Sequence, residues 1–194
     1  MKIDEFTPSG RSKRVVRSWY HNNDGTRTLF ESIVDPDVEL AIKQWKKSAG
    51  DTGVLIGGLA LSYHAKPRQT MDIDVLYLNQ KQIPDKVDGF KRIRDHAYLN
   101  LDTHVEIEIL DANFLNINAG LVQTVIDNAV NTGGMPVADA GGLIALKLQR
   151  GNRRDLGDIE TLIPCQPNIE PYREYLTDVQ IETFEQIKRE SIDD

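Results

Sequence analysis

The first half of the chain shows a helical apolar pattern, then a strand, then a second helical pattern. Three apolar residues recur at helical spacing, namely Val38, Ile42 and Trp45. They predict a helix that ends near Gly50. A short apolar run at residues 54–56 predicts a strand. Gly57-Gly58 interrupts that strand, and we expect a short helix to follow through His64.

Residues 72–110 alternate between strand and helix patterns. Residues 72–78 predict a strand. Residues 82–96 predict an amphipathic helix, because Pro84 suits a first helical turn and one apolar stripe follows. That stripe comprises Ile83, Val87, Phe90 and Ile93. Residues 98–110 alternate with period two and predict one or two further strands.

Helical patterns dominate the chain beyond these strands. Residues 119–130 are amphipathic, and Asp139 is well placed to cap a following helix. Residues 153–163 and 178–189 predict two more helices. A short strand is expected at residues 135–137.

The N-terminal segment differs from the rest, since residues 1–34 are polar and carry a basic cluster at residues 11–17. Alternating stretches at residues 15–20 and 26–34 predict a β-hairpin. Asp24-Gly25 supplies a turn between them.

This order of elements predicts an α/β (α+β) fold, in which helices pack against a small mixed sheet and the C-terminal half is helical. We expect an N-terminal extension at residues 1–34 and a main domain at residues 35–163. A helical tail at residues 164–194 is expected to pack on the same domain.

Composition narrows the class of protein. A chain of 194 residues with 40% hydrophobic and 27% charged residues is typical of one globular domain. The net charge of −7 argues against broad electrostatic binding of nucleic acid. No apolar run is long enough for a membrane span, and Cys165 is the single cysteine. We therefore expect a cytoplasmic protein without membrane contact.

Two carboxylates stand inside a predicted strand and suggest a metal site. Asp72 and Asp74 are two residues apart and share one face of the strand. Burying a carboxylate is costly unless a cation meets it. Carboxylate oxygens suit Mg²⁺ or Mn²⁺, and such ions promote phosphoryl transfer.

A third acid is expected on a neighbouring strand, where Glu106 and Glu108 share a face. We favour Glu108 as metal ligand or base, with Glu106 as a close alternative. Upstream, Gly57-Gly58 ends a strand and opens a helix, where the backbone can approach a phosphate closely.

Together these motifs resemble a known family. The stretch IGGLALSYHAKPRQTMDIDV looks like the signature of minimal nucleotidyltransferases of the polymerase-beta-like superfamily, in particular the AbiEii-like toxin group. The stretch LIALKLQRGNRRDLGDIETLI resembles a second motif of that group. The resemblance covers residues 52–163.

The resemblance implies a role for each matching residue. Asp72, Asp74 and Glu108 would be the catalytic acids and would hold the metal. The nucleotide would be bound by seven residues: Gly57, Gly58, Arg68, Thr70, Lys147, Asp155 and Asp158. Among these, the glycines and Lys147 would contact the phosphates, while Asp155 and Asp158 would orient the substrate or fix the basic residues.

Three positions depart from the family pattern. Leu59 stands where many relatives have a serine that reaches the phosphates, and the third acid is Glu rather than Asp. Asn152 stands where the second motif often has an arginine, so Arg153 or Arg154 would have to replace it.

The function implied is transfer of a nucleoside monophosphate from a nucleoside triphosphate (NTP) to an acceptor, with Mg²⁺ or Mn²⁺. The acceptor would be a tRNA, a protein hydroxyl or a small molecule. The resemblance also implies a toxin–antitoxin or phage-defence pair, with a cognate toxin or antitoxin protein as partner. The alternative is a non-catalytic nucleotide-binding module of the same fold that acts through a partner.

Overall fold

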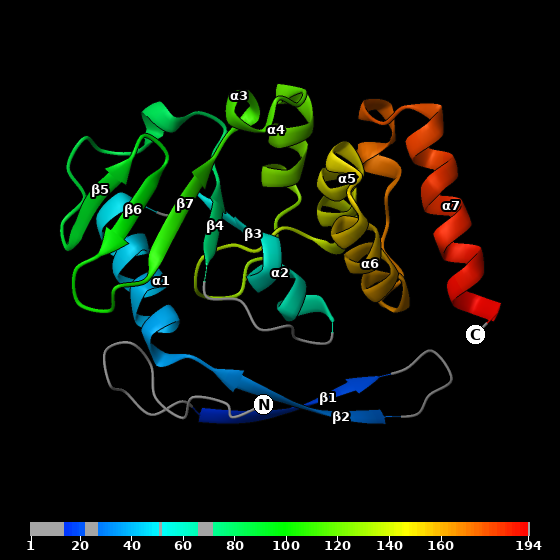
Figure 1. Cartoon of the computed structure of the whole chain (residues 1–194), viewed down its shortest axis with the longest axis horizontal. Coiled ribbons are helices and arrows are strands. Elements are labelled where there is room, and N and C mark those ends of the chain that lie inside the picture. Colours follow the sequence, from blue (N-terminus) through cyan, green and yellow to red (C-terminus); the bar gives the residue numbers. More distant parts are fainter. Residues whose placement is uncertain (1–13, 22–26, 51, 66–71, 194) are drawn as a thin grey trace.

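The structure is a computed structural model that describes residues 14–21, 27–50, 52–65 and 72–193. It confirms the predicted α+β architecture, with a mixed sheet and a helical C-terminal half (Figure 1). No helix in these ranges is long and apolar enough to cross a membrane.

The central sheet has five strands in the order β3-β4-β7-β6-β5. Their bounds are β3 (Val54–Ile56), β4 (Ile73–Leu76), β5 (Phe90–Arg94), β6 (Ala97–Asn100) and β7 (Glu106–Leu110). The pair β4–β7 is parallel, whereas β3–β4, β7–β6 and β6–β5 are antiparallel. The strand order therefore places β4 beside β7, although two strands separate them in the sequence.

Helices occupy most of the remaining described chain. They are α1 (Pro36–Ala49), α2 (Gly57–His64), α3 (Ala112–Leu115), α4 (Ala119–Asp127), α5 (Ala140–Arg150), α6 (Arg153–Leu162) and α7 (Asp178–Asp193). Short 3-10 helices cover Gln80–Gln82, Ile163–Cys165 and Glu170–Tyr175. Figure 1 shows α5, α6 and α7 side by side next to the sheet, and α2 between them and β4. The sheet and the C-terminal helices thus meet along α2.

Helix α1 forms where the sequence predicts it and packs on the apolar face of the sheet. Asp35 caps its N-terminus by accepting a hydrogen bond from the Asp37 backbone N–H at 2.9 Å. Trp45 is fully buried and makes edge-to-face contacts with Phe90 and Tyr98, each with ring centroids 5.0 Å apart. These contacts fix α1 against strands β5 and β6.

The buried Tyr77 makes the free energy of unfolding depend on pH in the alkaline range. Its hydroxyl accepts a hydrogen bond from the Trp45 indole N–H at 2.9 Å. Burial raises the pKa of Tyr77 to about 12. The unfolded phenol ionises near pH 10, so the unfolded chain loses its proton first and stability falls as the pH rises from about 10 to about 12.

We therefore expect Tyr77 to account for a loss of about 1.4 kcal/mol in the free energy of unfolding between about pH 8 and about pH 11. Tyr77→Phe leaves the buried indole N–H without its acceptor and should be less stable at neutral pH by about 1–3 kcal/mol. Its stability should also fall less steeply with pH, as measured by urea unfolding. Equal slopes for both proteins would contradict the assignment.

The helix predicted at residues 82–96 is wrong. The chain instead forms a 3-10 turn at Gln80–Gln82, a loop, and strand β5. Phe90 packs against Trp45 and pairs with Asn100 of β6, whereas Ile93 is 39% exposed. Tertiary packing and strand pairing therefore override the helical spacing. Gly89, with φ +84°, marks the turn into the strand.

Two smaller expectations also change. The strand expected at residues 72–78 is shorter and spans Ile73–Leu76. The segment expected as a strand at residues 135–137 makes only isolated bridges within the described chain, from Val137 to Leu55 and to Val130.

The predicted N-terminal hairpin is confirmed as a separate two-stranded antiparallel sheet. Its strands are β1 (Arg14–His21) and β2 (Arg27–Val34), and their register pairs Arg14 with Val34. The turn residues 22–26, which include Asp24-Gly25, lie outside the described residues. The division into an extension, a main domain and a tail stays a prediction.

Candidate active site

Strand register brings two of the expected acids together. In the parallel pair β4–β7, Asp74 lies directly opposite Glu108. Directly paired residues point to the same face of a sheet, so both carboxylates project from one face. The neighbouring residues on the other face, Ile73 and Ile107, are fully buried. The sheet thus presents its apolar face to α1 and its acidic face to α2 and the C-terminal helices.

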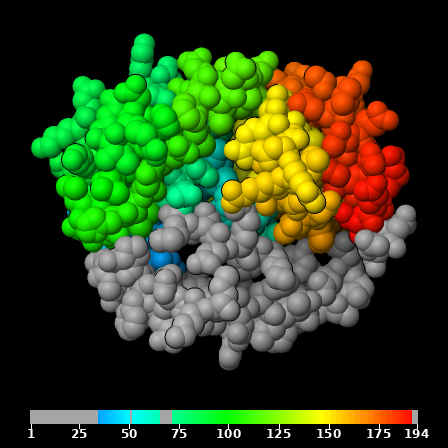
Figure 2. All heavy atoms as spheres, in the orientation of Figure 1, coloured from blue at the N-terminus to red at the C-terminus, as the bar shows by residue number. Residues whose placement is uncertain are grey.

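A cavity of about 330 Å³ opens on the acidic face. The expected residues that line it are Gly57, Gly58, Asp72, Asp74, Glu108 and Lys147. Figure 2 shows the surrounding surface, with α5 to α7 (yellow to red) beside the strands (green) and part of the blue-to-cyan segment between them. Arg68 and Thr70 lie outside the described residues.

Gly57 is required by the position of the Asp74 carboxylate. It adopts φ +66° at the point where β3 ends and α2 begins. A Cβ added to Gly57 would overlap with Oδ2 of Asp74. The sequence suggests that the glycine lets the backbone approach a phosphate, whereas in the structure the carboxylate of Asp74 occupies the space beside it.

Gly57→Ala is therefore expected to lower the free energy of unfolding by at least about 1 kcal/mol, because its backbone conformation disfavours a Cβ. The same change should displace the Asp74 side chain. Gly157→Ala in α6 is the matched control, since a Cβ there meets nothing within 4 Å. That control should raise the free energy of unfolding by about 0.5–1 kcal/mol, as alanine does within a helix. Equal effects in thermal and urea unfolding would contradict this account of Gly57.

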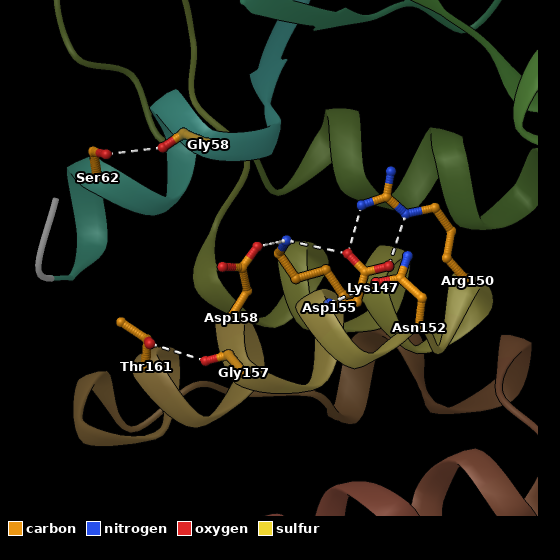
Figure 3. A network of polar contacts seen from close by, with 9 residues as sticks. All are labelled: Gly58, Ser62, Lys147, Arg150, Asn152, Asp155, Gly157, Asp158 and Thr161. Atoms are coloured by element: carbon orange, nitrogen blue, oxygen red, sulfur yellow. Dashed lines mark hydrogen bonds and ion pairs between the residues drawn. The ribbon is translucent and has the colours of Figure 1, made fainter. Parts of the chain in front are cut away.

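A buried charge network joins α5 to α6 next to the cavity (Figure 3). The Lys147 ammonium donates to Asp158 Oδ2 at 2.5 Å and lies 3.5 Å from Asp155 Oδ1. Lys147, Asp155 and Asp158 are only 3%, 0% and 7% exposed. A charge buried this deeply needs an opposite charge beside it. Within the described chain, Asp155 and Asp158 do not line the cavity themselves but form ion pairs with Lys147, which does.

Arg150 is the basic residue that sequence reasoning missed. Its guanidinium binds Asp155 through two hydrogen bonds, Nε to Oδ2 at 3.1 Å and an Nη atom to Oδ1 at 2.5 Å. Gly151 takes a left-handed conformation, with φ +59°, and turns the chain sharply between α5 and α6. Arg150, rather than Arg153 or Arg154, therefore makes the contact with Asp155, although Arg154 also lines the cavity.

Asn152, the departure from the family pattern, has a structural role. It is the N-cap of α6, and its side-chain oxygen accepts a hydrogen bond from the Asp155 backbone N–H at 3.0 Å. This bond fixes the first turn of α6 and with it the Asp155 side chain. The spacing of Asn152 and Asp155 is that of a helix cap, which was a readable signal in the sequence.

The structure separates the two glutamates of β7. Glu106 forms an ion pair with Arg94 of β5 and does not line the cavity. Glu108 lines the cavity and lies 3.4 Å from Nε2 of His96, measured from its Oε1. His96 does not line the cavity and was not expected beside Glu108; it lies there because it immediately precedes β6, in which Ala97 pairs with Glu108. Glu108 is thus the glutamate that lines the cavity together with Asp74.

The acids supply the donor atoms that a hard cation prefers. Asp72, Asp74 and Glu108 offer only carboxylate oxygens, which suits Mg²⁺ or Mn²⁺. Across the described part of the chain, no three His, Cys, Asp or Glu side chains are close enough together to hold a metal ion by themselves. Mg²⁺ is usually held by one or two carboxylates with water and substrate phosphates. The donor set therefore fits an ion that arrives with a nucleotide.

The chain was also compared with known proteins. No protein-family model matches it, and no curated protein sequence matches it either. The function is therefore argued from the geometry and chemistry of the cavity.

Proposed function

We propose that the protein is a metal-dependent nucleotidyltransferase. The observation that carries this proposal is the register of β4 and β7, which pairs Asp74 with Glu108 on one face of the sheet. Asp72 lines the same cavity, and so do the cationic residues Lys147, Arg150 and Arg154. Acids beside cations in one cavity match the two needs of phosphoryl transfer, which are metal binding and stabilisation of phosphate charge.

In the proposed reaction, a hydroxyl oxygen of the acceptor attacks the α-phosphorus of an NTP. A new bond forms between them, the bond from the α-phosphorus to its bridging oxygen breaks, and pyrophosphate leaves. Glu108 would take the hydroxyl proton or act as a third metal ligand. Asp72 and Asp74 would hold a Mg²⁺ or Mn²⁺ ion, which when bound neutralises phosphate charge.

The basic residues would stabilise the phosphates of the nucleotide. Arg150 is more accessible than Lys147, since its side chain is 55% exposed although it also binds Asp155. Lys147 is held at the cavity wall by Asp158 and Asp155. Lys147 is only 3% exposed, so its charge would act in a buried environment, where electrostatic interactions are stronger than in water. The fixed cations would thus need little reorganisation during the reaction.

A second candidate function is a nucleotide-binding module that does not transfer the nucleotide. Leu59 favours it, because this residue packs against the core and offers no hydroxyl to the phosphates. Such a module would bind NTP with Mg²⁺ and leave every acceptor unlabelled.

The acceptor in the transferase case would be a tRNA, a protein or a small molecule. A toxin or antitoxin partner is implied by the family resemblance.

The experiment that tests the proposal exploits the two glutamates of β7. Wild type, Glu108→Gln and Glu106→Gln are incubated with Mg²⁺, each α-³²P-labelled NTP, cellular RNA and lysate protein. Glu108→Gln should slow labelling by about 100-fold or more, as loss of a ligand or base does. Glu106→Gln should label like wild type, because Glu106 does not line the cavity. Equal loss in both variants, or none in either, would contradict the proposed site.

A further inference from the structure

The acid cavity has an apolar wall that the proposed chemistry does not use. Leu110, Phe114, Leu115, Ile117, Leu143 and Leu146 form this wall. Among the large hydrophobic side chains exposed in the described chain, Phe114 is the one that lines the cavity, and it is 45% exposed. A single exposed apolar side chain is ordinary on a protein surface, so what distinguishes Phe114 is its position in the lining of the cavity that holds the acids and the cations.

The backbone that carries Phe114 is fixed. Asp111 caps the short helix α3, and its Oδ1 accepts a hydrogen bond from the Phe114 backbone N–H at 2.8 Å. Asn116 ends the same turn in a left-handed conformation. The ring is therefore displayed from a short turn that is capped at both ends.

The ring is also held from the side. The imidazole of His96 lies against it, with ring centroids 4.2 Å apart and an angle of 38° between the planes. His96 in turn lies 3.4 Å from Glu108. Phe114, His96 and Glu108 thus form a row of contacts that leads from the apolar wall to the catalytic acids.

We propose that Phe114, supported by His96, is a stacking platform for a nucleobase. The inference rests on the proposed function. It adds a binding site for the nucleobase, which the acids and cations of the cavity do not provide. A ligand with phosphates and a flat aromatic ring matches a cavity whose lining includes both cations and an exposed aromatic ring. Stacking tolerates every base, because each has a π-face. The base belongs either to the NTP or to a single-stranded RNA acceptor, and binding experiments separate these sources.

The test measures binding of Mg²⁺ with each of four ligands, namely an NTP, tripolyphosphate, short single-stranded RNA and an abasic strand of equal length. Phe114→Ala removes the ring, Phe114→Trp retains an aromatic face, and Tyr63→Leu is a matched control. Tyr63 is 53% exposed and does not line the cavity. Thermal unfolding of each variant shows that it is folded.

If the base is that of the nucleotide, Phe114→Ala should weaken NTP binding by about 5- to 150-fold and leave tripolyphosphate binding unchanged. If the base is that of the acceptor, the same loss appears for RNA and is absent for the abasic strand. Phe114→Trp should retain binding, and its fluorescence should be quenched by the base. Tyr63→Leu should bind like wild type.

An unchanged affinity for both NTP and RNA in Phe114→Ala would overturn the platform while leaving the transferase proposal in place. Failure of the wild type to bind any NTP would overturn the transferase proposal instead, and the RNA measurement would still decide the role of Phe114. If wild type binds neither NTP nor RNA, the platform is also wrong.

Discussion

Asp74→Asn should lower the rate of nucleotidyl transfer by about 100- to 1000-fold, the loss typical of removing one well-placed electrostatic group from an active site. The carboxylate of Asp74 lies beside Gly57 and faces Glu108 across the β4–β7 pair. Asparagine has nearly the same size, so the packing at Gly57 should be kept. The negative charge is lost, and with it the affinity for a divalent ion.

The measurement is the initial rate of label transfer from an α-³²P-labelled NTP at several Mg²⁺ concentrations. Asp88→Asn is the matched control, because the side chain of Asp88 is 88% exposed and does not line the cavity. That control should keep the wild-type rate. A rate for Asp74→Asn equal to that of Asp88→Asn would mean that Asp74 has no part in the reaction.

Lys147→Met should lower the free energy of unfolding by about 3–5 kcal/mol, which is typical of removing one partner from a buried ion pair. The ammonium of Lys147 contacts the carboxylates of Asp155 and Asp158, and all three side chains are buried. Methionine matches the length of the lysine stem, so the main change is the loss of the positive charge. The charge network, more than the packing of the Lys147 stem, should therefore determine the stability of the contact between α5 and α6.

Urea unfolding of four proteins tests this prediction. Lys91→Met is the control, because Lys91 is an exposed lysine of β5, and it should change stability by less than about 0.5 kcal/mol. Asp158→Asn added to Lys147→Met should restore part of the loss, since it removes one of the buried negative charges. A small loss for Lys147→Met alone would show that the network does not stabilise the fold.

Much of the secondary structure could be predicted because it depends on local signals. The helix that begins at Pro36 was readable from the apolar spacing of Val38, Ile42 and Trp45. The period-two pattern placed Glu106 and Glu108 on one face of β7, whereas Asp72 precedes β4 and only Asp74 lies within that strand. The helix expected at residues 82–96 failed because its apolar residues belong to a loop and to strand β5, of which Phe90 packs on Trp45.

The candidate site was harder to predict from the sequence, because it depends on pairing between segments that are distant along the chain. Glu108 was favoured over Glu106 on local pattern, but only the strand register shows which glutamate faces Asp74. Arg150 reaches Asp155 because Gly151 turns the chain between two helices. No local pattern signals such a contact, since it depends on the angle between the helices.

The central claim is that the acid cavity transfers a nucleotide, and paired labels of the same NTP test it most directly. Wild-type protein, Mg²⁺ and acceptors are incubated with NTP labelled with ³²P at either the α- or the γ-phosphate. Nucleotidyl transfer predicts label on the acceptor from the α-labelled NTP only, with the γ-label released in pyrophosphate. Label on the acceptor from the γ-phosphate, or from neither position for all four NTPs, would contradict the claim.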